Sequence, residues 1–131
     1  MAYKLRSKIK KAWIKALRSG EYKQCKRKLK DSATGSYCCL GVLAEVTAKI
    51  EETDYDRYRD GANSSLPNWL LIEAVFREKH LYRSGVFDDP WHVKVREEKN
   101  GETPGQTSLY QLNDGYGYTF DEIADVIERY F

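Results

Sequence analysis

Cationic, amide and tyrosine side chains gather in two segments that lie far apart in the sequence. The first segment is near the start of the chain and contains Arg18, Tyr22, Lys23, Gln24 and Arg27. Arginine and lysine neutralise phosphate, tyrosine rings stack on a base or sugar, and amides donate and accept hydrogen bonds. This combination of residue types is typical of a site for a phosphate-bearing ligand.

The second segment, residues 111–118, reads Gln-Leu-Asn-Asp-Gly-Tyr-Gly-Tyr and precedes a predicted helix. We expect a loop here, in which Asn113 and Asp114 face the ligand and Tyr116 or Tyr118 stacks on it. Free backbone amides before a helix can also hold an anion. The alternative is a structural role, because asparagine, aspartate and glycine are ordinary turn and cap residues. A ligand site requires that the two segments meet in the folded chain.

Two adjacent cysteines precede an apolar run and raise a catalytic possibility. A helix N-terminus lowers the pKa of a thiol, so Cys38 or Cys39 could be a nucleophile. A base would be required, and His80 and His92 stand in no recognisable catalytic context. Buried cysteine is more commonly a packing residue, and these residues with Cys25 show no paired spacing for zinc. We therefore predict no catalytic residue, no metal and no cofactor.

Positive charge is concentrated in the first thirty residues, which hold twelve lysines and arginines and one glutamate, although the whole chain has a formal net charge of +2. Either the basic end pairs with acidic residues elsewhere in the fold or it faces an anionic partner. In the predicted last helix, Asp121, Asp125 and Glu128 form an acidic face that could pair with it. No nucleic-acid-binding motif accompanies the basic residues. Those at helical spacing form a cationic ridge: Lys4, Lys8, Lys11, Lys15 and Arg18.

The hydrophobic pattern predicts the elements that carry these residues. Apolar residues at intervals of three and four predict a helix over residues 3–19, ended by Gly20. The most hydrophobic stretch, residues 40–50, predicts a central helix, and Pro67 opens another. Thr119 and Glu122 form a capping box before the last helix. We also expect a basic extended strand over residues 22–30, a turn at 32–35, a long loop or weak hairpin over 51–65, and a strand over 91–96 with a turn at 100–101.

The length of 131 residues and a hydrophobic content of 41% suit one domain. We expect a small α+β domain over residues 1–131, with about three main helices, the basic strand and one or two short hairpins. No stretch approaches the roughly 18 apolar residues of a membrane span, and three cysteines, two of them adjacent, do not suggest disulfides. These observations favour a cytosolic protein with reduced thiols. The predicted core contains Trp13, Leu17, Leu40, Leu43, Ile123 and Ile127.

A set of short segments, which together cover about half of the chain, forms a recognisable pattern. The segments are Trp13, the ALRSG sequence at 16–20, Tyr22, Gln24, the YCCLGVL sequence at 37–43, Leu66 and Pro67, the LND sequence at 112–114 and the FDEIADVIE sequence at 120–128. In this order they resemble a family of small uncharacterised proteins encoded by bacteriophages and prophages. Members of that family typically carry a double cysteine with no fixed histidine beside it, which argues against a cysteine–histidine enzyme.

This resemblance implies a phage accessory protein that antagonises host defence in the host cytoplasm. We expect a non-catalytic protein that sequesters a nucleotide immune signal, cyclic or derived from ADP-ribose. Because sites in such proteins are commonly completed by a neighbouring subunit, we also expect a homo-oligomer. One alternative is an inhibitor that binds a host defence protein or nucleic acid through the basic face. A second alternative is an enzyme that uses Cys38 or Cys39. No membrane partner is expected.

Overall fold

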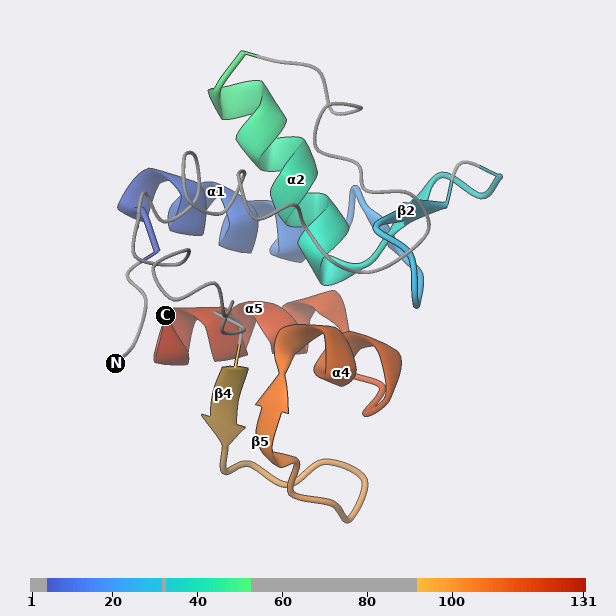
Figure 1. Cartoon of the computed structure of the whole chain (residues 1–131), viewed down its shortest axis with the longest axis vertical. Coiled ribbons are helices and arrows are strands. Elements are labelled where there is room, and N and C mark those ends of the chain that lie inside the picture. Colours follow the sequence, from blue (N-terminus) through green and yellow to red (C-terminus); the bar gives the residue numbers. More distant parts are fainter. Residues whose placement is uncertain (1–4, 32, 53–91) are drawn as a thin grey trace, which may run out of the picture.

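A computed structural model of the chain describes residues 5–31, 33–52 and 92–131 (Figure 1). The predicted helix at Pro67 and nearly all of the predicted loop over 51–65 lie outside these residues. The described part forms an α+β fold, as predicted. Its elements, in chain order, are α1 (Ser7–Arg18), β1 (Lys23–Gln24), β2 (Lys30–Asp31), β3 (Ser36–Tyr37), α2 (Cys39–Ile50), β4 (His92–Val95), β5 (Gly105–Ser108), α4 (Leu109–Asp114) and α5 (Phe120–Tyr130).

Helix α1 packs against both α2 and α5. Its inward face carries Ile9, Trp13 and Leu17, which are four residues apart and therefore share one side of the helix. The indole Nε1–H of Trp13 donates to the carbonyl oxygen of Cys39 at 2.9 Å, which ties α1 to the start of α2. Just past the helix end, Gly20 has a φ of +77°, the left-handed conformation that favours glycine. The predicted helix is confirmed from Ser7 to Arg18, and so is its end at Gly20. It begins later than predicted, because Arg6 has an extended ψ of 131° and residues 3 and 4 lie outside the described ranges.

Helix α2 is the predicted central helix, and most of its residues are buried. The backbone of Leu29 crosses its first turn at Gly41. A Cβ atom at that position would overlap the carbonyl oxygen of Leu29, so a glycine is needed for this close approach. The approach places the Leu29 side chain in the core, where it is 0% exposed. All six predicted core residues are buried: Trp13, Leu17, Leu40, Leu43, Ile123 and Ile127.

A small sheet of two-residue strands follows α1. Strand β3 lies in the middle, parallel to β1 and antiparallel to β2, so that Gln24 and Lys30 both face Tyr37 in the register. The predicted continuous strand over residues 22–30 is wrong. The chain leaves β1 because Arg27 has a φ of +67° and Leu29 turns into the core, and it pairs again only at β2.

Two predicted turns are present. The first turn connects β2 to β3, and in it the N–H of Gly35 donates to the carbonyl oxygen of Asp31 at 2.8 Å. In the second, Asn100 and Gly101 have φ angles of 54° and 81°, as a tight hairpin turn requires. This second turn lies in the arm that joins β4 to β5, which pair antiparallel. The predicted strand over residues 91–96 is confirmed from 92 to 95.

Two helices, α4 and α5, form the end of the chain. The predicted loop over residues 111–118 is wrong in its first half, because α4 extends to Asp114. Gln111 Oε1 accepts the N–H of Ser108 at 3.0 Å and so caps the start of α4. Helix α5 begins with the predicted capping box: Thr119 Oγ1 accepts the N–H of Glu122 at 3.2 Å, and Glu122 Oε1 accepts the N–H of Thr119 at 3.0 Å. Figure 1 shows α1 above α5 and the β4–β5 hairpin below it.

Candidate functional site

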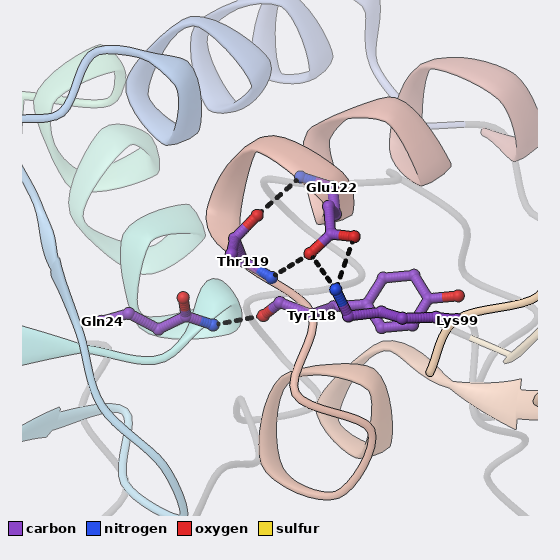
Figure 2. A network of polar contacts seen from close by, with 5 residues as sticks. All are labelled: Gln24, Lys99, Tyr118, Thr119 and Glu122. Carbon is purple, nitrogen blue, oxygen red and sulfur yellow. Dashed lines mark hydrogen bonds and ion pairs between the residues drawn. The ribbon is translucent and has the colours of Figure 1, made fainter. Parts of the chain in front are cut away.

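The two segments predicted to form a site meet through the side chains of Gln24 and Asn113. Gln24 Nε2 donates to Asn113 Oδ1 and to the carbonyl oxygen of Tyr118, both at 2.8 Å, and Figure 2 shows the second bond. Asn113 Nδ2 donates to the carbonyl oxygen of Cys25 at 2.9 Å. We call these bonds the Gln24–Asn113 junction. The junction joins β1 to the end of α4, 89 residues further along the chain.

The amide hydrogens of the junction are used inside the protein. Asn113 is 0% exposed, and it also donates to Asp114 Oδ1 at 2.8 Å. Gln24 Nε2 already donates to two oxygens. A ligand would have to replace these bonds, and breaking them would leave buried polar groups unpaired. Gln24 and Asn113 are therefore suited to holding β1 against α4.

The segment between β1 and β2 is held in one conformation at three points. Its first residue, Cys25, donates its N–H to a carbonyl oxygen of β3 at 2.8 Å, and its last, Leu29, accepts an N–H from the start of α2 at 3.3 Å. Between these anchors, the N–H of Arg27 donates to Asp114 Oδ1 at 3.0 Å. The carboxylate of Asp114 thus fixes the middle of the segment against the end of α4.

Exposed positive charges lie on this fixed segment. We call Lys26, Arg27 and Lys28 the cationic loop, and Lys23 precedes it in β1. All four residues are exposed, and none forms an ion pair with another residue in the part of the chain that the structure describes. Positive side chains without internal counterions attract an anion. Lys23 and Arg27, which we predict to bind phosphate, are free of such pairing within the described ranges.

Arg18, the third predicted phosphate ligand, is engaged elsewhere. Its Nη2 donates to Asp125 Oδ1 at 2.6 Å and to Glu128 Oε2 at 2.7 Å. The hydrogen bonds to Asp125 and Glu128 raise the pKa of the guanidinium. Arg18 therefore joins α1 to α5 and takes no part in the bonds of the Gln24–Asn113 junction. The predicted pairing of the cationic ridge with the acidic face of the last helix is confirmed at this residue.

The three predicted stacking residues differ in exposure. Tyr118 is only 5% exposed, and burial raises the pKa of its phenol. Tyr22 packs edge to face on Tyr37 with ring centroids 5.2 Å apart, and its hydroxyl accepts a bond from Lys49 Nζ at 3.1 Å. Tyr116 is half-buried, as Tyr22 is, and lies two residues beyond the end of α4. Tyr22 and Tyr116, unlike Tyr118, therefore keep part of their surface exposed.

Sequence reasoning missed a polar cluster around Glu122 (Figure 2). Lys99 Nζ lies 2.7 Å from both carboxylate oxygens of Glu122 and 5.5 Å from the ring centre of Tyr118. Burial raises the pKa of Glu122, but the hydrogen bonds from Lys99 and Thr119 outweigh it and hold the pKa below its ordinary value. The capping-box pattern in the sequence predicts that Glu122 bonds to the backbone at the start of α5. No local signal connects Glu122 to a lysine 23 residues earlier.

A cavity of about 180 Å³ lies beside this cluster, between the β4–β5 arm and α5. Lys99 and Arg129 line it, and both are neutralised by carboxylates, Lys99 by Glu122 and Arg129 by Glu97. The hydroxyl of Tyr130 also donates to Glu97, at 3.2 Å. With its positive groups already paired, this cavity is a poor site for an anion.

Cys38 and Cys39 are unsuited to nucleophilic catalysis. Both side chains are buried, and burial raises the pKa of Cys38 to about 12 and that of Cys39 well above its ordinary value. The thiol of Cys39 donates to the carbonyl oxygen of Leu109 at 3.7 Å, a contact between α2 and α4. His80 lies outside the described residues. Within the described ranges, no group of three or more histidine, cysteine, aspartate or glutamate side chains could hold a metal ion.

Fold and site together define a small α+β protein that presents an ordered cationic loop. The chain belongs to the family of a domain of unknown function, DUF8296, whose model matches residues 5–131. Comparisons with curated proteins and with solved structures found no match. None of the helices in the described ranges combines the length and the apolar composition that a membrane span requires.

The residues on which the expected likeness to phage proteins was based make many of the contacts described above. Trp13 bonds to the backbone of α2, and Gln24 bonds to Asn113. Arg18 pairs with Asp125 in α5. These residues therefore have structural roles that explain their types, whereas the three residues of the cationic loop lie outside the matching segments.

Proposed function

We propose that the protein is a non-catalytic binding protein for a phosphate-bearing nucleotide, and that the cationic loop is its phosphate contact. One observation carries the proposal: the N–H of Arg27 is bound to Asp114 Oδ1, so the loop is ordered before any ligand arrives. A site whose backbone is already ordered loses less conformational entropy on binding than a mobile one. The exposed charges of Lys23, Lys26 and Lys28 then add to that of Arg27.

Each residue of the predicted site takes a distinct role in this proposal. Lys23 and Arg27 neutralise phosphate, and Tyr116 stacks on the base or sugar. Gln24, Asn113 and Asp114 do not touch the ligand; they are positioning residues that hold the loop against α4. Arg18 is assigned to the α1–α5 contact, where its charge is shared by two carboxylates.

The resemblance to phage proteins narrows the ligand to a nucleotide immune signal, which the protein would sequester intact in the host cytoplasm. Capture without turnover agrees with the state of Cys38 and Cys39, whose raised pKa values keep both thiols protonated at neutral pH. Homo-oligomer formation stays a prediction, and light scattering of the purified protein measures it directly.

Isothermal titration calorimetry tests the proposal with ADP-ribose, a cyclic dinucleotide and inorganic phosphate as ligands. We expect at least one nucleotide to bind and to be recovered intact after the protein is denatured by heat. The variant Lys26→Gln/Arg27→Asn/Lys28→Gln removes the charges of the cationic loop. The variant retains Lys23. Loss of the Arg27 contact and of one contact from the two lysines beside it, at about 1.5 kcal/mol each, weakens binding by roughly 100-fold.

A matched control removes three charges from α1 instead, as Lys8→Gln/Lys11→Gln/Lys15→Gln. These lysines are exposed, and the net charge of the two variants is equal. We expect the control to bind the nucleotide with nearly unchanged affinity. Equal weakening in both variants would mean that only overall charge matters, and a degraded nucleotide would indicate catalysis. Either outcome contradicts the proposal.

A further inference from the structure

A groove of about 770 Å³ lies along the solvent side of α1. Ser7, Lys10, Lys11, Ile14, Lys15 and Arg18 line it, and Glu128 of α5 is its opposite wall. The α1 residues are spaced by three or four and form one stripe on the helix, about 16 Å long at 1.5 Å per residue. Such a stripe is the surface on which a second helix packs.

The floor of the groove is apolar and its outer rim is positive. Ile14 is half-buried and packs against the core. Lys11 and Lys15 on the rim are exposed and form no ion pair with any residue in the described ranges. Lys10, nearer to α5, donates to the backbone carbonyl oxygen of Glu128 at 3.4 Å, a bond that supplies no counterion. Within the described ranges, the positive charge without a counterion therefore lies on the α1 side of the groove.

The opposite wall favours a peptide over a nucleic acid. Glu128 and, beside it, Asp125 are carboxylates, both paired with Arg18. A nucleic acid carries phosphates along its whole length and would bring some of them against these carboxylates. An acidic amphipathic helix separates its two faces, so its carboxylates can meet Lys11 and Lys15 while its apolar side covers Ile14.

We propose that the groove between α1 and α5 binds an acidic amphipathic helix of a partner protein. Binding of this kind needs about three turns of helix to match the stripe. The surface is separate from the cationic loop, so the proposal does not depend on nucleotide binding.

Fluorescence anisotropy with a synthetic peptide tests the inference. The probe is a labelled 16-residue helix-forming peptide with leucines at intervals of three and four and glutamates flanking them. A scrambled peptide of the same composition and a single-stranded oligothymidine are the competitors. We expect the patterned peptide to bind, and the scrambled peptide to bind at least tenfold more weakly because it cannot present one apolar face.

Two variants locate the contact. Lys11→Glu/Lys15→Glu reverses the charges of the rim and should lower the affinity for the patterned peptide at least tenfold. Lys23→Glu/Lys28→Glu makes the same change in charge at the β1–β2 segment and should leave peptide affinity unchanged. A third variant, Ile14→Ser, should also lower the affinity for the patterned peptide, and circular dichroism checks that this variant folds. If Ile14→Ser does not fold, the comparison of the two lysine variants tests the inference without it.

Three results would overturn the inference: no binding of the patterned peptide, equal binding of the scrambled peptide, or equal loss in both lysine variants. Displacement of the peptide by oligothymidine with higher affinity would also overturn it, in favour of a nucleic-acid surface. None of these results bears on whether the cationic loop binds a nucleotide, which calorimetry measures separately.

Discussion

Arg27 has a left-handed backbone conformation, with a φ of +67°, which an arginine adopts only at a cost in free energy. The bond from its N–H to Asp114 Oδ1 offsets part of this cost. Asp114 also accepts a bond from Asn113, so one carboxylate organises both the loop and the buried amide beside it. At the scale of single residues, the proposed function therefore depends on an aspartate that we do not expect to touch the ligand.

The variant Asp114→Ala tests this dependence. Loss of the acceptor should lower the free energy of unfolding by about 1–2 kcal/mol, measured by urea denaturation. Nucleotide affinity should fall as well, because the loop must then be ordered on binding. Asp114→Asn keeps an acceptor oxygen, so it should lose less stability and less nucleotide affinity than Asp114→Ala. Unchanged nucleotide affinity in Asp114→Ala would show that the ordered loop is not needed.

The buried thiols should make the protein less stable at alkaline pH. Burial raises the pKa of Cys38 from 9.0 to about 12, so the folded state holds the thiol proton more tightly than the unfolded state does. Stability from this group is complete below pH 9 and is lost as the pH rises towards 12, by about 1.4 kcal/mol per pH unit. The pKa of Cys39 is raised in the same direction.

Thermal denaturation between pH 8 and pH 11 measures this loss. Other groups also titrate in this range, so the control is Cys38→Ala/Cys39→Ala, in which they remain. We expect the melting temperature of the control to fall less steeply with pH than that of the natural chain. Parallel slopes would mean that the thiols do not retain their protons in the folded state.

At the scale of elements, the approach of the β1–β2 segment to α2 depends on one glycine. The carbonyl of Leu29 lies so close to α2 that no Cβ fits at Gly41. Leu29 is one anchor of the cationic loop, so the packing of α2 against Leu29 fixes the position of that loop.

Gly41→Ala should therefore destabilise the protein by about 3 kcal/mol, because backbone must move to admit the methyl group. Gly35→Ala is the matched control. Gly35 has a φ of +67°, but a methyl group there would meet no atom within 4 Å, so this variant should lose only about 1 kcal/mol through backbone strain. Urea denaturation of both variants measures the difference. Equal losses would show that α2 and Leu29 separate easily.

At the scale of the whole molecule, opposite charges from the two ends of the chain meet between α1 and α5. Arg18 contacts Asp125 and Glu128, which lie 107 and 110 residues away in the sequence. The basic start of the chain is thus partly neutralised by its acidic end. Arg6 pairs with Glu51 instead, at 2.8 Å. Lys11 and Lys15 form no ion pair with the residues that the structure describes.

Arg18→Gln separates the structural role of this arginine from a role in binding. We expect a small decrease in melting temperature at low salt that disappears at about 0.5 M NaCl, where exposed ion pairs are screened. Nucleotide affinity should not change. Lys8→Gln removes one charge from an exposed position of the same helix and controls for net charge. A large loss of nucleotide affinity in Arg18→Gln, without a similar loss in Lys8→Gln, would show that Arg18 does bind the ligand.

Signals that depend on neighbouring residues were read correctly from the sequence. The capping box of Thr119 and Glu122, the turn at Asn100 and the inward stripe of α1 are all present, since each is decided within about one helical turn or one hairpin. Two segments were predicted wrongly. Residues 22–30 contain no long strand, because Leu29 is drawn into the core, and residues 111–114 form a helix that is capped by Gln111.

The sequence by itself determined that α1 is amphipathic, that residues 40–50 belong to the central helix, and that cations, amides and tyrosines are available in two segments. Only the tertiary structure decided which of them remain for a ligand. Gln24 and Asn113 bond to each other, Arg18 pairs with α5, and the charges of the cationic loop stay exposed. The physical reason is that a side chain's partners across 89 or 107 residues are chosen by the packing of helices, which no local pattern encodes.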